Sequence, residues 1–131
     1  MSVGVDIIEV ARVRRALESR GSRFAGRIFT DAEVLQCESR RNKFQSYAAR
    51  FAAKEAVAKL IGTGFAGFLP RDIEILNAEM GKPKVLLHGR AKDCASAAGV
   101  RQIEVSMSHV AEYAVAVAAA KEEAVGESPS S

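Results

Sequence analysis

The chain has 131 residues, of which 48% are hydrophobic and 27% are charged, and this favours one soluble globular domain with its own core. Its two cysteines, Cys37 and Cys94, have no CxxC spacing, which favours inert thiols in a reduced compartment. Asp6 and Glu9 interrupt the only apolar run near the N-terminus, and no segment approaches the roughly 20 apolar residues that span a bilayer. We therefore expect a cytoplasmic protein with no membrane partner.

Nineteen basic and sixteen acidic residues give a formal net charge of +3. Many of the basic residues lie in the first third of the chain: Arg12, Arg14, Arg15, Arg20, Arg23, Arg27, Arg40, Arg41 and Lys43. A basic surface of this kind favours an anionic partner such as nucleic acid, an acidic protein or a phosphorylated ligand. Solvated helix faces would give the same number of charges, so the charge alone does not choose among these partners.

The segment 2–10 is rich in β-branched residues and predicts a strand. Asp6 lies in its middle, where a charge is costly unless a metal ion or hydrogen bonds compensate it. The alternative is an edge strand whose Asp6 points to water. Gly4 shares a face with Asp6 and would let a ligand or another backbone come close.

Two short helices are predicted before the longest one. Residues 11–19 show a basic helical pattern that ends at Gly21. Thr30 and Glu33 have the spacing of a capping box, in which each side chain binds the backbone N–H of the other residue. A helix is therefore expected from this box to Glu38.

Residues 46–62 predict the helix around which the chain is organised, about four turns long and rich in alanine. A narrow apolar stripe runs along it, small enough for another element to pack closely: Ala49, Ala53, Ala56 and Leu60. Glu55 and Lys59 lie four residues apart beside this stripe, and Arg50 and Lys54 form a separate row. Glu55 and Lys59 would suit a metal and phosphate site, although an ordinary surface ion pair has the same spacing.

The second half of the chain predicts four strands and one short helix. The strands cover 72–78, 84–88, 102–109 and 113–120, with helix ambiguity in the last, and the helix covers 89–98. In the first of these strands we expect Glu74 to face water. The element order β-α-α-α-β-β-α-β-β predicts an α+β domain, with a small, mostly antiparallel sheet packed on the long helix. The domain is expected to cover 1–121, and the polar tail 122–131 is expected to be disordered.

Side chains able to do chemistry lie in three predicted elements. They are Asp6 in the first strand, Glu55 and Lys59 on the long helix, and Ser108 and His109 at a strand end. Two carboxylates brought together from a strand and a helix repel each other unless a cation lies between them. So few oxygen ligands fit Mg²⁺, which keeps waters and accepts a substrate phosphate. Lys59 would then meet that phosphate, and His109 would bind phosphate, carry a proton or lie at the surface without a role.

Two segments resemble motifs of the 4′-phosphopantetheinyl transferases. The first is Gly4-Val-Asp-Ile7, which is similar to their G-x-D motif. The second is Arg50-Phe-Ala-Ala-Lys-Glu-Ala56 with the following Lys59, which is similar to their F-x-x-K-E-A-x-x-K motif. Gly81-Lys-Pro83 and Ser106-Met-Ser-His109 complete the family pattern in the same order. Nearly the whole chain, to about Lys121, is similar to the small class of this family, the holo-acyl-carrier-protein synthases of fatty-acid biosynthesis.

The resemblance implies transfer of 4′-phosphopantetheine from coenzyme A to a serine hydroxyl of apo-acyl carrier protein, which releases adenosine 3′,5′-bisphosphate. Asp6 and Glu55 match the Mg²⁺ ligands of the family, and Lys59 matches the basic residue at the leaving phosphate. The metal and Lys59 would neutralise charge as the phosphoanhydride opens. Either Glu55 or a metal-bound water would take the serine proton.

The resemblance also implies which residues bind the two substrates. Those that match the family's coenzyme A contacts are Arg50, Lys59, Gly81, Lys82, Pro83, Ser108 and His109. Those that lie where the family docks an acidic helix of the carrier protein are Arg12, Arg20 and Arg23, which fits the uneven charge.

Short members of the family are homotrimers with active sites between subunits, so the resemblance implies a homotrimer. It implies no nucleic acid partner. A different class of function is a non-catalytic basic module that binds an acidic protein or RNA. Such a module would need no acidic pair and would bind independently of Mg²⁺, and its affinity would fall steeply with salt.

Overall fold

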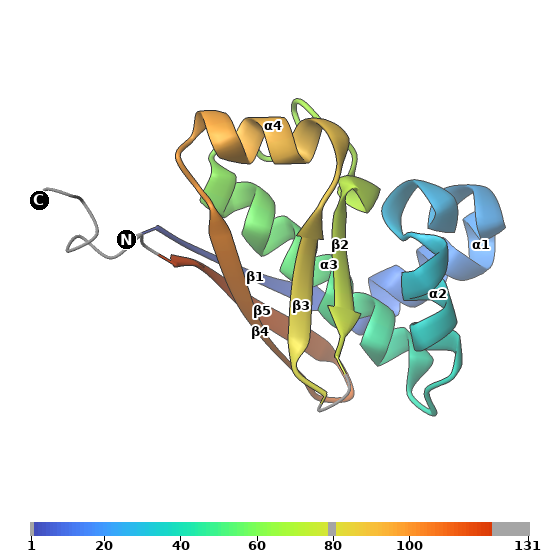
Figure 1. The fold of residues 1–131 in the computed structure, drawn as a ribbon. Helices are drawn as coiled ribbons and strands as arrows, with labels where there is room; N and C mark the ends of the chain where they lie inside the picture. The colour runs from blue at the N-terminus through green and yellow to red at the C-terminus, as the bar shows by residue number, and fades with distance from the viewer. Residues whose placement is uncertain (1, 79–80, 122–131) are drawn as a thin grey trace, which may run out of the picture.

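The computed structural model describes residues 2–78 and 81–121 and has the α+β element order that the sequence predicts (Figure 1). The elements are β1 Val3–Glu9, α1 Val10–Ile28, α2 Asp31–Glu38, α3 Lys43–Ile61, the 3₁₀ turn η1 Pro70–Asp72, β2 Ile73–Asn77, β3 Pro83–Leu87, α4 Gly89–Ala97, β4 Gln102–His109 and β5 Tyr113–Lys121. The predicted disordered tail, 122–131, lies outside the described residues. No helix in the described ranges is long and apolar enough to cross a membrane.

The strands form two antiparallel sheets beside the long helix. One sheet has the order β1-β5-β4, and the other is the β2-β3 hairpin. The segment with helix ambiguity is β5, which is a strand because it pairs along its length with β1 on one edge and β4 on the other. Figure 1 shows α3 crossing the centre of the molecule, with α1 and α2 together at one side and α4 across one end.

The small residues of α3 let β1 pack close, as the sequence predicts. All four residues of the alanine and leucine stripe are buried. A Cβ atom added to Gly4 would lie 2.0 Å from the carbonyl oxygen of Ala56, so only glycine permits this approach of strand to helix. The element that comes close to Gly4 is therefore the backbone of α3, and the same packing brings Asp6 against the helix.

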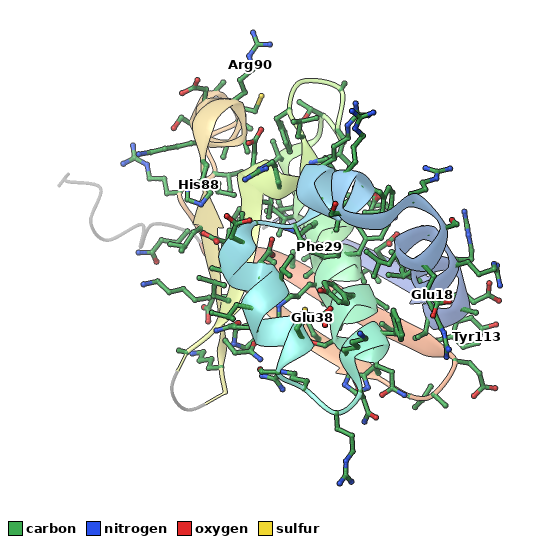
Figure 2. All side chains as sticks on the ribbon, turned by 90° about the vertical axis from the view of Figure 1, so that its right-hand side faces the viewer. Glu18, Phe29, Glu38, His88, Arg90 and Tyr113 are labelled. Atoms are coloured by element: carbon green, nitrogen blue, oxygen red, sulfur yellow. The ribbon has the colours of Figure 1, made fainter. Side chains whose placement is uncertain are left out.

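Helix α1 is interrupted where the sequence predicts its end. Gly21 has φ 68° and ψ −153°, outside the helical region, and a second helical stretch then continues to Ile28. Phe29 follows and is buried, with its ring centroid 4.9 Å from that of Tyr47 on α3. Figure 2 shows Phe29 inside the molecule. The Gly21 break thus lets the chain turn and fill the core between α1 and α3.

The prediction that Glu74 faces water is wrong. This residue is only 8% exposed, because Thr30 at the N-cap of α2 and His88 at the β3–α4 junction contact it. Thr30 donates its hydroxyl to Glu74 Oε2 at 2.5 Å, and His88 Nε2 lies 2.9 Å from Glu74 Oε1. Strand alternation predicted the direction of the side chain correctly but not what lies beyond it.

The outward face of the three-stranded sheet is apolar over β1 and β5, whereas β4 contributes Glu104, Ser106 and Ser108 to it. Its exposed large apolar side chains are Val3, Val5 and Ile7 on β1 and Tyr113 and Val117 on β5. They are neighbours across the ladder, since Val5 is opposite Val117 and Ile7 opposite Val115. Figure 2 shows Tyr113 at the outer edge of the molecule. An apolar patch of this kind on a small domain indicates a contact surface.

Candidate active site

Strand β1 and helix α3 bring Asp6, Glu55 and Lys59 to one open cleft of about 770 Å³. Lys59 Nζ lies 2.7 Å from Asp6 Oδ1 and 3.1 Å from the carbonyl oxygen of Val5. The Asp6 side chain is 17% exposed and the Lys59 side chain 53%, so Asp6 is held against α3 while Lys59 reaches toward water. The alternative in which the Asp6 carboxylate points to water is therefore wrong.

The electrostatics of this cleft favour a bound cation. Burial raises the pKa of Glu55 above its ordinary value, the charge of Asp6 adds to the rise, and Lys59 opposes it. The hydrogen bond to Asp6 is the largest cause that raises the pKa of Lys59. The charge of Asp6 thus disfavours ionisation of Glu55, and a cation between the two carboxylates would relieve that repulsion.

The carboxylate pair is an incomplete set of metal ligands. Within residues 2–78 and 81–121, no group of three or more His, Cys, Asp and Glu side chains is placed to hold a metal ion. Two carboxylate oxygens fit Mg²⁺, which takes few protein ligands and completes its shell with waters and substrate phosphates. The residues present therefore fit a magnesium site that a phosphate-containing substrate would complete.

The rest of this cleft is lined by both basic and apolar residues. Its basic residues come from α1: Arg12, Arg15 and Arg20. Its apolar residues include Phe24, Ile28 and Phe51. The Arg20 guanidinium lies 5.4 Å from the Phe24 ring centroid, in the range of a cation–π contact. Arg23 is exposed beyond the Gly21 break and does not line this cleft.

A second cleft, of about 640 Å³, collects most of the residues predicted to bind coenzyme A. It is lined by Arg50 of α3, Gly81, Lys82 and Pro83 of the β2–β3 turn, and His109 at the end of β4. Ser108 is not among its lining residues, and it lies opposite Val115 in the β4–β5 ladder. The two clefts have no described lining residue in common.

Arg50 reaches this second cleft from a buried position. It is 2% exposed and donates to the Ile75 carbonyl at 3.1 Å, Ser46 Oγ at 2.6 Å and Gln36 Oε1 at 2.8 Å. Each bond uses a different nitrogen, and because a guanidinium has five N–H donors it retains others for an anion. Arg50 is thus fixed rigidly to β2 and α2.

Several lining residues of the second cleft were not predicted as site residues. Among them are Arg40, Arg41 and Asn42 in the α2–α3 connection, Asn77 at the end of β2 and Ser106 of β4. The adjacent arginines 40 and 41, which precede α3, are visible in the sequence as a basic pair. Because this connection could not be aligned with the family pattern, no role was predicted for them. Asn77 Oδ1 is buried without a hydrogen-bond partner in the described part of the chain, which only the fold could reveal.

Comparisons with known proteins identify the family and the fold of the chain. The family model described as "4′-phosphopantetheinyl transferase superfamily" matches residues 2–118. A holo-[acyl-carrier-protein] synthase of Ruminiclostridium cellulolyticum is 52% identical over 122 residues, which cover 90% of each chain. The structure of the corresponding synthase of Neisseria meningitidis superposes with a TM-score of 0.83 at 33% identity, covering 92% of this chain and 98% of the other. That of Helicobacter pylori, in complex with coenzyme A, superposes with a TM-score of 0.80 at 27% identity, covering 91% and 99%. The chain therefore belongs to the 4′-phosphopantetheinyl transferase superfamily.

Proposed function

We propose that residues 1–121 form a holo-acyl-carrier-protein synthase, which transfers 4′-phosphopantetheine from coenzyme A to a serine hydroxyl of apo-acyl carrier protein. The single observation that carries the proposal is the meeting of Asp6, Glu55 and Lys59 in one cleft, from a strand and a helix that only Gly4 allows to pack this closely. A relative that is 52% identical and bears this name supports it.

The reaction breaks one bond and forms one. The serine oxygen bonds to the phosphorus that carries pantetheine, and the phosphoanhydride bond to the nucleotide breaks, which releases adenosine 3′,5′-bisphosphate. The serine proton passes to Glu55 or to a water in the cleft, and Glu55 is placed for this role because it lines the same cleft as Asp6 and Lys59. Lys59 supplies a positive charge to the leaving phosphate.

Asp6 and Glu55 would hold Mg²⁺ through their carboxylate oxygens. When bound, this ion supplies Lewis-acid stabilisation of the pyrophosphate charge. Lys59 pairs with Asp6 in the structure, and its ammonium would turn from Asp6 to the substrate phosphate if Asp6 held the ion. The side chain of Lys59 is flexible and half exposed, which makes this exchange of partners inexpensive.

The second cleft is proposed to bind the nucleotide of coenzyme A. Its Arg50, Lys82 and His109 would contact phosphate groups, while Gly81 and Pro83 shape the turn of the hairpin. Ser108, which lies outside this cleft, would contact the nucleotide only from a neighbouring surface.

We propose a homotrimer, in which the apolar outward face of β1 and β5 lies between subunits. A monomer would leave Val3, Val5 and Ile7 exposed to water, which favours burial in an assembly. Because the two clefts have no described lining residue in common, assembly also gives a way to join the cleft of Asp6 and Glu55 in one subunit to the cleft of His109 in the next.

The partner protein is proposed to dock on α1 through Arg12, Arg20 and Arg23. Two of these arginines line the cleft of Asp6 and Glu55, so an acidic helix bound there would present its serine to that cleft. The proposed setting is fatty-acid biosynthesis in the cytoplasm, without a membrane or nucleic acid partner.

Intact-mass spectrometry of apo-acyl carrier protein tests the proposal. The carrier is incubated with this protein, coenzyme A and Mg²⁺, and a matched reaction contains EDTA. We expect a mass gain of one phosphopantetheine arm that is lost with EDTA. Absence of any gain with several folded carrier proteins would contradict the proposal and favour the binding module, whose affinity would depend on salt and not on Mg²⁺.

A further inference from the structure

The β2–β3 hairpin has a free edge that faces the helices. Residues 72, 74 and 78 use their backbone groups toward β3 or its turn, as the bonds His88 N–H to Asp72 O and Ala78 N–H to Lys82 O show. Strand alternation therefore directs the backbone groups of Ile73, Ile75 and Asn77 away from β3. The other sheet does not pair with this edge.

Side chains of α2 and α3 occupy that edge as a third strand would. Ile75 N–H donates to Glu33 Oε2 at 2.8 Å, and Asn77 N–H donates to Gln36 Oε1 at 3.0 Å. The three carbonyl oxygens of Ile73, Ile75 and Asn77 accept from Lys54 Nζ, Arg50 Nε and Gln36 Nε2. Every backbone polar group of this buried edge thereby has a partner.

Glu33 and Lys54 are the ion pair of this edge. Lys54 Nζ lies 2.7 Å from Glu33 Oε1, and both side chains are 0% exposed. Lys54 also donates to the Pro70 carbonyl at 3.3 Å, and Glu33 Oε1 accepts from the Thr30 N–H at 2.9 Å. A buried pair is weak evidence for stability, because apolar residues of similar size often replace one without loss. Its specific contribution here is geometric, since apolar side chains cannot bind the edge of β2.

The place of the hairpin matters because its turn carries Gly81, Lys82 and Pro83 into the second cleft. We propose that Glu33 and Lys54 are positioning residues, which bind the free edge of β2 and fix the nucleotide-binding turn relative to α3. Lys54 directly precedes Glu55, so one helix fixes both the turn and the proposed metal carboxylate. The expected kinetic effect rests on the proposed function. The binding of the β2 edge by Glu33 and Lys54 is independent of that function.

The kinetic test uses the double variant Glu33→Gln/Lys54→Met, which removes both charges of the buried pair together. We expect the KM for coenzyme A to rise about tenfold, while kcat and the KM for carrier protein stay within about twofold. The matched control is Lys43→Met, which removes a half-exposed ion pair between α2 and α3 that does not touch β2 and should change none of these values. A folded double variant with an unchanged KM for coenzyme A would overturn the proposal.

Amide hydrogen exchange of the wild-type protein tests the same proposal without activity or variants. The Ile75 amide, bound to Glu33, should exchange as slowly as the Glu74 amide, whose residue is paired with β3. Fast exchange at Ile75 beside a protected Glu74 would overturn the proposal even if the double variant failed to fold. If the wild-type protein transferred no phosphopantetheine, the proposed function would fail and the exchange measurement would still decide whether the edge is bound.

Discussion

Lys54 and Lys59 stand five residues apart on α3 and have opposite surroundings. The Lys54 side chain is fully buried with Glu33, whereas the Lys59 side chain is 53% exposed and pairs with Asp6. Burial lowers the pKa of Lys54, while the hydrogen bond to Asp6 raises the pKa of Lys59. A lysine that must exchange partners during a reaction needs water and an open cleft, and a lysine that fixes a backbone needs neither.

The same helix thus divides into two functional sides. One side, with Glu55 and Lys59, faces a cleft where ligands can enter. The other side, with Arg50 and Lys54, has its charges bound to α2 and β2, and of these two residues only Arg50 also lines the second cleft. The difference is one of energetics, because an exposed pair is worth little and breaks easily, whereas one buried partner left alone is very unfavourable.

The largest expected effect on stability comes from the buried side. Lys54→Met leaves the Glu33 carboxylate unpaired and should lower the free energy of unfolding by about 3–5 kcal/mol. Lys59→Met should lower it by less than about 1 kcal/mol, because its pair is half exposed. Urea unfolding of both variants measures the difference. Equal losses would remove the distinction between the two sides.

The largest expected effect on activity comes from the open side. Glu55→Gln should reduce transfer by about 10²–10³-fold or more, because it removes the carboxylate that would hold Mg²⁺ and could accept the serine proton. The mass assay gives the rate, and circular dichroism checks that the fold is retained. The matched control is again Lys43→Met, and full activity of Glu55→Gln would refute its assignment as a metal ligand.

A smaller effect should separate the two substrates. Arg12→Glu reverses a charge on α1 beside the open cleft and should raise the KM for carrier protein by about tenfold while the KM for coenzyme A stays the same. The effect should shrink in high salt. An unchanged KM for carrier protein would remove Arg12 from the docking surface.

The smallest expected effect is on stability against pH. The pKa of Glu55 is raised in the folded state, so folded protein holds its proton more tightly, and stability falls as pH rises from its ordinary pKa of 4.5 through the raised value. Glu55→Gln has no such loss, so it should be at least as stable as wild type at pH 7 without Mg²⁺. The difference should vanish below pH 4.5. Thermal unfolding at several pH values measures this, and a less stable variant at pH 7 would contradict the burial of Glu55.

Sequence reasoning predicted the elements and the open side because their signals are local. The period of two in β1, the capping box of Thr30 and the alanine stripe of α3 all act within a few residues, and the small residues at Gly4 and Ala56 indicated a close approach. It did not predict the buried side. Glu33 is 42 residues from Ile75 in the chain, and nothing near Glu33 indicates that its second oxygen binds a strand edge.

Charges at helical spacing resemble a solvated face, so Lys54 gave no sign of its burial. The prediction that Glu74 is exposed was wrong for the same reason, because strand alternation gives the direction of a side chain but not what packs over it. These positions depend on contacts between elements far apart in the chain, which composition and periodicity do not encode.

The most direct test of the open site is binding of Mn²⁺, a paramagnetic substitute for Mg²⁺, followed by electron paramagnetic resonance in the presence of coenzyme A. We predict about one ion per chain for the wild-type protein, displaced by Mg²⁺, and loss of this binding in Asp6→Asn and Glu55→Gln but not in Lys43→Met. Equal Mn²⁺ binding by Glu55→Gln, or none by the wild-type protein, would contradict the placement of the metal between β1 and α3.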